Sequence, residues 1–339
     1  GDIGVCWRLA RQLFSEHNLQ VTLWVDDLTV AQKIIPSLNV ALSTQSVAGI
    51  VVQHWQQHSA FESVAEVVIE AFSCGLPDAY LAKMQPQQIW VNLEYLAAET
   101  WVDDFHGKHA EYQNLKRHFY FRGFTANTGG LLRERSVPQD KHVIADDSIK
   151  VSLFCYANAP ILALLTALAN SPQITTLFVP TNNHIQKYAD FFNQVQLQVG
   201  EDYVRGNLTL KLLTFLSQDQ YDALLQSCDV NFVRGEDSWV RAIWAAQPMV
   251  WQPYVQEENT HMHKLEAFLT LFYATCDSTV GAKISAANHA WSDGGFSDKD
   301  WLSLLENLVD LKLHAEKQAK ELSKQLDLAS KLVIFCNNL

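Results

Sequence analysis

The chain has 339 residues, and because one domain usually spans roughly 100–200 residues, its length favours two domains. Hydrophobic residues make up 48% and charged residues 18%, a composition that excludes a disordered chain. The 25 Lys and Arg against 37 Asp and Glu leave a net charge of −12, which argues against binding to nucleic acid or to an anionic membrane.

The six cysteines lie singly along the chain, without a Cys-x-x-Cys pair, so we expect neither a zinc site nor a disulfide framework. No apolar run reaches about 18 residues and no signal-peptide pattern opens the chain, so we expect a cytoplasmic protein that does not insert into a membrane. The sequence opens on a glycine loop with no strand before it. We therefore expect that residues upstream of Gly1, including a first strand, are missing.

Short apolar runs alternate with helical patterns in the first half of the chain, which is typical of βαβ units and parallel sheets. In chain order we expect a helix at 5–16, strands at 20–25 and 50–52, a helix at 61–64, a strand at 67–70, a helix at 79–84 and a strand at 88–93. A polar stretch, SVPQDKHVIADDSIK, then follows Arg135. We place a domain boundary in it.

The second half begins a new α/β series. We expect strands at 151–155, 175–179, 208–213, 230–233 and 249–252, with helices at 159–169, 186–197, 220–226 and 238–246. Residues 301–331 have apolar positions at helical spacing and many Lys and Glu, which predicts one or two amphipathic helices. The predicted domains are residues 1–148, residues 149–315, and a C-terminal helix in 316–339 that packs back on the first domain.

The stretch CDVNFVRGEDSWVRAIWAAQPMVWQPY reads as strand, tight loop, helix, turn and strand. After the strand at 230–233, the loop brings a guanidinium, a glycine, two carboxylates and a hydroxyl to a helix N-terminus, in Arg234, Gly235, Glu236, Asp237 and Ser238. Such a point suits the diphosphate of a ligand. A purely structural interpretation, in which Asp237 and Ser238 only cap the helix, explains two of these five residues.

Five segments together resemble the bacterial elongation factor P arginine rhamnosyltransferases (EarP-like enzymes) over nearly the whole chain. They are GDIGVCWRLARQL at the start, GFTANTGGLLRE at 123–134, FCYAN at 154–158, RGEDSWVRAIWA at 234–245, and the QExxxHxxKLxAFL run at 256–269. The resemblance implies an α/β GT-B fold, in which two Rossmann-like domains face a central cleft. It also implies a metal-independent inverting transferase with no cofactor, which moves L-rhamnose from dTDP-β-L-rhamnose to an arginine in a loop of the N-terminal domain of elongation factor P.

The family motif Asp-Asn-x-Gly-Asp-Ile-Gly matches this chain from its second aspartate onward, which is Asp2. The earlier aspartate of the motif has no counterpart here, and the stretch 106–118 looks short for the family. An arginine guanidinium is a poor nucleophile because its lone pair is delocalised, so a carboxylate that takes up a proton and a second one that fixes the planar group are needed. Asp2 and Glu236 are the candidates.

The leaving dTDP gains negative charge, which the helix start at Asp237 and Ser238 can stabilise without a metal. Base and sugar recognition need flat rings and a few polar groups near strand ends. Phe215 and Tyr221 could flank thymine, Gln218 could read the base edge, and Gln256 could bind sugar hydroxyls. The further candidates for donor binding are Phe154, Tyr156, Arg234 and Tyr254, and for each single aromatic the structural alternative is packing in a core.

Two other functions remain open at this point. Asp26 and Asp27 end a predicted strand where an NAD-dependent oxidoreductase would bind ribose, although the opening Gly-Asp-Ile-Gly is only a weak dinucleotide motif. A non-catalytic adaptor of a translation factor is the second alternative. The histidine pairs His54/His58 and His261/His263 have no further ligand at metal spacing, so a metal site is not expected.

Overall fold

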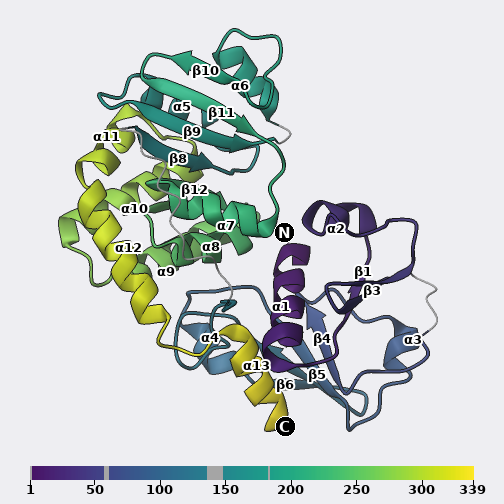
Figure 1. Cartoon of the computed structure of the whole chain (residues 1–339). Coiled ribbons are helices and arrows are strands. Elements are labelled where there is room, and N and C mark those ends of the chain that lie inside the picture. Colours follow the sequence, from purple (N-terminus) through teal and green to yellow (C-terminus); the bar gives the residue numbers. More distant parts are fainter. Residues whose placement is uncertain (1, 57–60, 136–147, 182–183) are drawn as a thin grey trace. The chain divides into compact units, whose positions relative to one another are not determined.

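The computed structural model describes residues 2–56, 61–135, 148–181 and 184–339. The chain divides into two compact units, here called unit 1 (Gly1–Ser136 with Ser323–Leu339) and unit 2 (Val137–Leu322) (Figure 1). The boundary predicted between residues 148 and 149 lies next to the segment 136–147, which is outside the described residues. The boundary predicted between 315 and 316 differs from the structure, because it would cut a continuous helix that belongs to unit 2.

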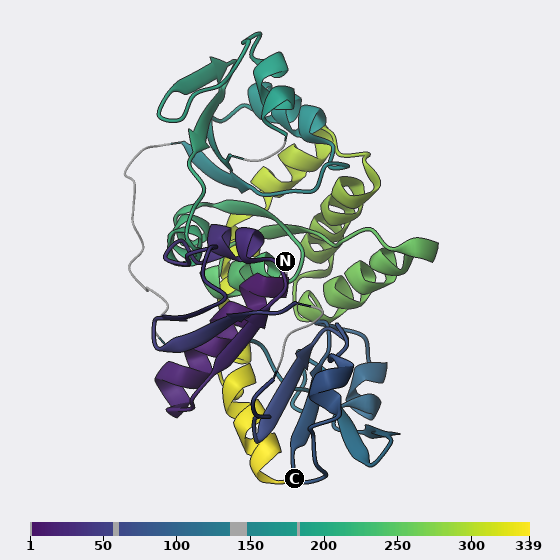
Figure 2. The ribbon, with the colours of Figure 1, turned by 90° about the vertical axis from the view of Figure 1, so that its right-hand side faces the viewer.

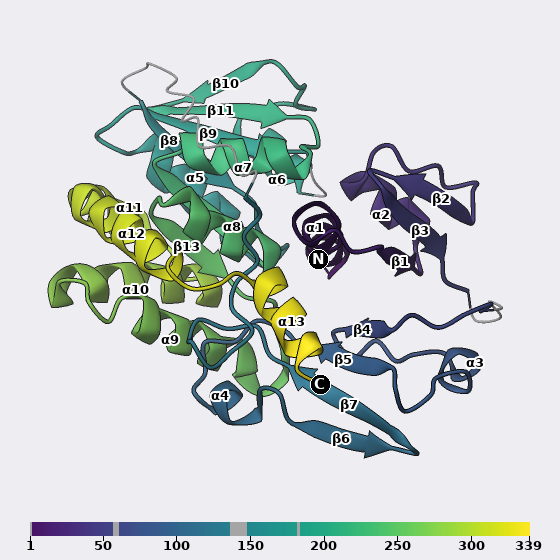
Figure 3. The same cartoon turned by 60° about the horizontal axis from the view of Figure 1, so that its bottom comes forward.

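Unit 1 holds two small sheets. The first has the order β1-β3-β2, in which β1 (Thr22–Val25) runs parallel to β3 (Ile50–His54) and β2 (Thr44–Val47) is antiparallel to β3. The second has the order β4-β5-β7-β6, and its members are β4 (Val67–Ala71), β5 (Ile89–Leu93), β6 (His109–Tyr112) and β7 (Leu115–Tyr120). Strand β6 pairs antiparallel with β7, and this hairpin contains most of the residues of the stretch 106–118 (Figure 3).

Helix α1 (Asp2–His17) packs on two cores of unit 1 because its apolar residues lie on two faces. Val5, Leu9 and Leu13, spaced four apart, pack in the core that contains β5 and the helix α13 (Leu328–Asn337). Trp7 and Ala10 pack instead in the core around β1 and β3. Figure 2 shows α13, in yellow, running beside α1, in purple. The other helices of unit 1 are α2 (Leu28–Ile34), α3 (Asp78–Leu81) and α4 (Trp101–Phe105).

Unit 2 is built on one six-stranded sheet in the order β10-β11-β9-β8-β12-β13. Its strands are β8 (Ile149–Leu153), β9 (Thr175–Pro180), β10 (Asp202–Arg205), β11 (Leu208–Leu213), β12 (Val230–Arg234) and β13 (Met249–Gln252), and all run parallel except β10. Its helices are α5 (Ile161–Ala169), α6 (Ile185–Phe191), α7 (Gln218–Ser227), α8 (Asp237–Ala245), α9 (Thr260–Phe272), α10 (Ser278–Asp293), α11 (Asp298–Glu306) and α12 (Leu308–Leu322), with a 3-10 turn at Glu257–Asn259.

The order of these strands creates a switch point in the sheet. From β8 the chain moves to β9 and β11 on one side, and it then crosses to β12 and β13 on the other. In open α/β sheets, ligands bind outside the carboxyl ends of the strands at such a point. The carboxyl ends of β8 and β12 are therefore where the sheet of unit 2 favours a ligand.

Two kinds of sequence-based expectation about local structure differ from the fold. No helix forms at 61–64, where Phe61 instead packs its ring against Trp24 and Tyr80. The structure also contains elements that the sequence did not predict, namely the strands β2, β6, β7 and β10 and the helices α2, α4, α9 and α10. Among the described residues, none of the helices combines the length and apolarity needed to cross a membrane.

Candidate active site

The two ring-bearing residues after β8 and the loop after β12 lie together at the switch point of unit 2. We call Phe154, Tyr156, Arg234, Gly235 and Glu236 the carboxyl-edge cluster. The Arg234 guanidinium carbon lies 4.2 Å from the centre of the Phe154 ring and 4.7 Å from the centre of the Tyr156 ring. Its Nη1 donates a hydrogen bond to the Cys155 carbonyl at 3.0 Å. Arg234 is thus fixed between two rings, with its charge at the edge of the sheet.

Gly235 makes the sharp turn from β12 into α8. Its φ of +62° is in the left-handed region, and an added Cβ would lie 3.0 Å from the Tyr156 hydroxyl. The turn is held by two hydrogen bonds to β13, because the Trp251 indole donates to the Gly235 carbonyl at 2.8 Å and the Gly235 N–H donates to the Gln252 carbonyl at 3.2 Å. Glycine is therefore needed here both for conformation and for space.

Helix α8 starts one residue earlier than predicted, which changes the role of Asp237. Glu236 is the N-cap residue and Asp237 is the first helical residue, so the expectation that Asp237 caps the helix is wrong. The Glu236 side chain makes no capping hydrogen bond. Ser238 follows in the first turn and is buried. The helix therefore presents its N-terminal dipole and a hydroxyl at this edge without a side-chain cap from Glu236.

A buried ion pair fixes the direction of α8. Arg241 donates from Nε and Nη2 to the two carboxylate oxygens of Asp222 in α7, at 3.0 and 2.8 Å. This two-bond geometry holds both side chains rigidly. The N-terminus of α8 is consequently aimed by a contact that lies inside the protein, rather than by the site itself.

The structure adds residues that the sequence analysis missed. Gln252, at the end of β13, is 1% exposed, and its side-chain oxygen accepts from the Tyr156 N–H at 2.8 Å while its amide nitrogen donates to Asn158 at 3.2 Å. A buried glutamine at a strand end was the available signal. Lys187, in α6, donates to the Ala157 carbonyl at 2.9 Å. Burial, and then the charges of Lys187 and Arg234, lower the pKa of His184, the N-cap residue of α6.

The remaining candidates for donor binding do not belong to the carboxyl-edge cluster. Tyr221 lies in α7, with its ring 5.8 Å from that of Phe154, and burial raises its pKa. Tyr254 is exposed and its ring lies 5.5 Å from Tyr156. Phe215 is exposed in the loop after β11. Gln218 does not lie in a loop as expected, because Ser217 and Gln220 form a capping box that makes Gln218 the first residue of α7. Gln256 lies before the 3-10 turn, and its N–H is 3.4 Å from the His261 ring.

Asp2, the candidate from unit 1, lies in the first turn of α1, and its side chain is exposed. The Tyr95 hydroxyl donates to its Oδ2 at 3.4 Å. Asp27, which the oxidoreductase alternative needs for ribose, is instead the N-cap of α2 and accepts from the N–H groups of Thr29 and Val30 at 2.9 Å. Its carboxylate is used to cap α2, and the Asp26 carboxylate accepts from the Asp27 N–H at 2.9 Å, so both carboxylates of that alternative make local contacts within the fold.

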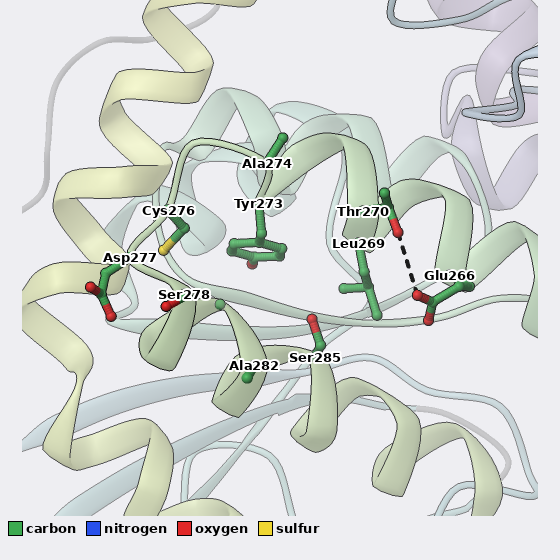
Figure 4. A pocket seen from close by; sticks show the side chains of 11 residues that line it. Glu266, Leu269, Thr270, Tyr273, Ala274, Cys276, Asp277, Ser278, Ala282 and Ser285 are labelled. Atoms are coloured by element: carbon green, nitrogen blue, oxygen red, sulfur yellow. Dashed lines mark hydrogen bonds between the residues drawn. The ribbon is translucent and has the colours of Figure 1, made fainter.

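A separate hollow of about 290 Å³ lies between α9 and α10 (Figure 4). Glu266, Tyr273, Cys276 and Asp277 line it, and the Thr270 hydroxyl donates to Glu266 at 3.4 Å. None of the described residues that line it is Lys, Arg or His. With two carboxylates and no cation, this hollow is unsuited to a diphosphate. Within the described residues, no group of three or more His, Cys, Asp or Glu could hold a metal ion, and His58 lies outside them.

Comparisons with known proteins show the family of this chain. A family model described as "Elongation-Factor P (EF-P) rhamnosyltransferase EarP" matches residues 1–337. The chain belongs to the EarP family. It is 40% identical to a protein-arginine rhamnosyltransferase of Pseudomonas putida, over 100% of this chain and 96% of that protein. It is also 38% identical to a protein-arginine rhamnosyltransferase of Pseudomonas aeruginosa, over 99% of this chain and 95% of that protein.

Solved structures place the EarP-family chain in its fold class. A structure described as the structural basis for EarP-mediated arginine glycosylation of translation elongation factor EF-P is 30% identical, with a TM-score of 0.68, and covers 100% of this chain and 95% of that one. The MurG structure from Acinetobacter baumannii is 12% identical with a TM-score of 0.53, over 100% and 96% of the two chains, and shows the fold alone. The predictions of a GT-B fold and of a glycosyltransferase are confirmed.

Proposed function

We propose that this chain transfers L-rhamnose from dTDP-β-L-rhamnose to an arginine in a loop of the N-terminal domain of elongation factor P, with inversion at the anomeric carbon. Its membership of the EarP family supports the reaction type and the acceptor protein. The carboxyl-edge cluster supports a nucleotide-sugar donor, because it sets a fixed cation and a helix N-terminus at the switch point of a parallel sheet. We place the reaction in the cytoplasm, where translation factors act.

The donor half of the proposal follows from charge. A diphosphate needs cations and N–H donors, and Arg234, the first turn of α8 and the Ser238 hydroxyl supply both. Lys187 in α6, which donates to the Ala157 carbonyl, and His184 at the N-cap of α6 add basic groups. Phe154 and Tyr156 sandwich Arg234, which leaves Phe215, Tyr221 and Gln218 as candidates for the base and Tyr254 and Gln256 for the sugar.

In the chemical step, a nitrogen of the acceptor guanidine attacks the anomeric carbon of rhamnose. The bond from that carbon to the diphosphate oxygen breaks, and its electron pair stays on the departing dTDP. A proton leaves the attacking nitrogen as the new C–N bond forms, and the Asp2 carboxylate accepts it. Glu236 fixes the planar guanidinium by paired hydrogen bonds. The charge that grows on dTDP is stabilised by the start of α8, so neither a metal nor a cofactor is part of the mechanism.

A panel of nucleotides tests the donor site directly. A ligand that binds only the folded state at about 100 times its Kd stabilises the fold by about 2.7 kcal/mol. We expect dTDP to raise the melting temperature more than UDP, GDP or NAD at equal concentrations. An Arg234→Met variant, which keeps an unbranched side chain between the two rings but removes the charge, should lose the shift with dTDP. A shift with NAD alone would support an oxidoreductase and reject the proposal.

A further inference from the structure

We propose that Tyr95 is a positioning residue that orients the Asp2 carboxylate toward the acceptor, an inference that rests on the proposed function of Asp2. The Tyr95 hydroxyl donates to Oδ2 of Asp2 at 3.4 Å, and both residues belong to unit 1. This distance is long for an O–H···O hydrogen bond, so the contact contributes little to the stability of the fold. With Oδ2 held by the phenol, Oδ1 is the oxygen that remains for the acceptor.

An exposed carboxylate in the first turn of a helix has several orientations available, since its side-chain torsions are restricted only by local contacts. A general base must lie within hydrogen-bond reach of the proton that it accepts, and a misplaced one loses rate even when its substrate still binds. Holding one carboxylate oxygen reduces the number of orientations. The gain therefore appears in the chemical step and not in substrate affinity.

Tyr95 can hold Asp2 because its own ring is fixed. The ring stacks on Phe72, with 4.7 Å between the ring centres and 21° between their planes. The guanidinium of Arg122 also lies over the Phe72 ring, 5.1 Å from the ring centre, and Arg122 is 2% exposed. Arg122 Nε donates to the carbonyl of Glu94, the residue before Tyr95, at 3.1 Å. One buried arginine thus supports both the ring under Tyr95 and the backbone next to it.

The turn that carries Phe72 has an unusual backbone. Phe72 and Ser73 have φ values of +58° and +55°, in the left-handed region that bulky residues rarely adopt. Asn92 holds the turn, because its side-chain oxygen accepts from the Ser73 N–H at 3.0 Å and its nitrogen donates to the Ser73 hydroxyl at 2.9 Å. Strain of this kind persists only where surrounding contacts impose it, and it clusters at functional sites. Here its result is a ring placed under Tyr95.

Core packing does not account for Tyr95, whose side chain is 42% exposed. A core tyrosine would bury its ring and find an internal partner for its hydroxyl. Tyr95 stacks on Phe72 and directs its hydroxyl to a carboxylate that is itself exposed. The arrangement is suited to holding a surface group in one orientation.

Steady-state kinetics of Tyr95→Phe test the inference, because this change removes the hydroxyl and keeps the stacked ring. Tyr112→Phe is the matched control, since Tyr112 is 43% exposed in the same unit and its ring packs edge-on against Trp90. With elongation factor P and dTDP-rhamnose, we expect Tyr95→Phe to lower kcat about tenfold while KM for both substrates and the melting temperature stay unchanged. Tyr95→Ala, which also removes the stacking, should lower kcat further.

Three results would overturn the inference. Equal kcat values for Tyr95→Phe and Tyr112→Phe, with an active wild type, would show that the hydroxyl does not position Asp2 and would leave the proposed function intact. A higher KM for elongation factor P at unchanged kcat would assign Tyr95 to binding instead. An inactive wild type would reject the proposed function, and this inference with it.

Discussion

An added Cβ at position 235 would make a tight contact with Tyr156, whose hydroxyl lies 3.0 Å from where that Cβ would stand. Because Tyr156 also packs against Arg234, a shift of its ring would disturb the cation of the carboxyl-edge cluster. The turn, the ring and the guanidinium therefore form one connected arrangement, and changes at Gly235 should affect donor binding.

We expect Gly235→Ala to weaken dTDP binding by about tenfold or more, beyond its cost in stability of roughly 1–2 kcal/mol for a left-handed alanine. Gly294→Ala is the matched control, because Gly294 ends α10 with φ +85° and has no other atom within 4 Å of an added Cβ. It should lose similar stability and keep its dTDP affinity. Calorimetric titration and thermal unfolding of both variants separate the two effects, and equal dTDP affinity in both would contradict the account.

Asp2→Asn should reduce turnover by at least about a hundredfold, since general base catalysis contributes typically 10²–10⁴-fold. Its affinity for dTDP should change by less than about tenfold, or roughly 1.4 kcal/mol, because Asp2 is proposed to act only on the acceptor. Asp78→Asn, which alters another exposed carboxylate in a first helical turn of unit 1, is the control and should leave the rate unchanged. A wild-type turnover rate in the Asp2→Asn variant would show that Asp2 is not the general base.

Ser238→Ala should weaken dTDP binding by about 1–2 kcal/mol, the range for a hydrogen bond to a charged group at a buried site. The same mechanism makes the rate independent of divalent cations, because the start of α8 meets the phosphate charge. Initial rates with excess EDTA should equal those without it. Loss of the rate in EDTA and its recovery with magnesium would show that a metal stabilises the leaving group.

Binding of dTDP-rhamnose should strengthen as the pH falls, through His184. Burial, Lys187 and Arg234 lower the pKa of His184 in the free protein. Since a diphosphate nearby favours the charged ring, binding raises this pKa and takes up a proton in the pH range between the two values. The effect of His184 on the stability of the free protein has the opposite sign. Because its pKa is lower in the folded than in the unfolded protein, the free energy of unfolding falls as the pH drops through the unfolded pKa. Titrations in buffers with different ionisation enthalpies count the protons, and His184→Gln should bind with no such uptake.

The sequence predicted well those features that depend on short patterns. The strand at 208–213 agrees with β11, and the loop Arg234–Ser238 was recognised as a strand end followed by a helix because an apolar run, a glycine and a helical pattern are contiguous. The contacts of Gln252 with Tyr156 and of Tyr95 with Asp2 span 96 and 93 positions. Such pairs depend on how strands are ordered in a sheet, which no local pattern encodes. The left-handed Phe72 is a further example, since a bulky residue at positive φ contradicts its local preference.

The most direct test of the central claim is the intact mass of elongation factor P after incubation with this protein and dTDP-β-L-rhamnose. A variant of the factor with its target arginine changed to lysine serves as the control, because a lysine ammonium cannot make the paired hydrogen bonds that a planar guanidinium makes with a carboxylate. We predict that the native factor gains one rhamnosyl group and that the lysine variant gains none. An unchanged mass of the native factor, or an equal gain in the lysine variant, would contradict the account.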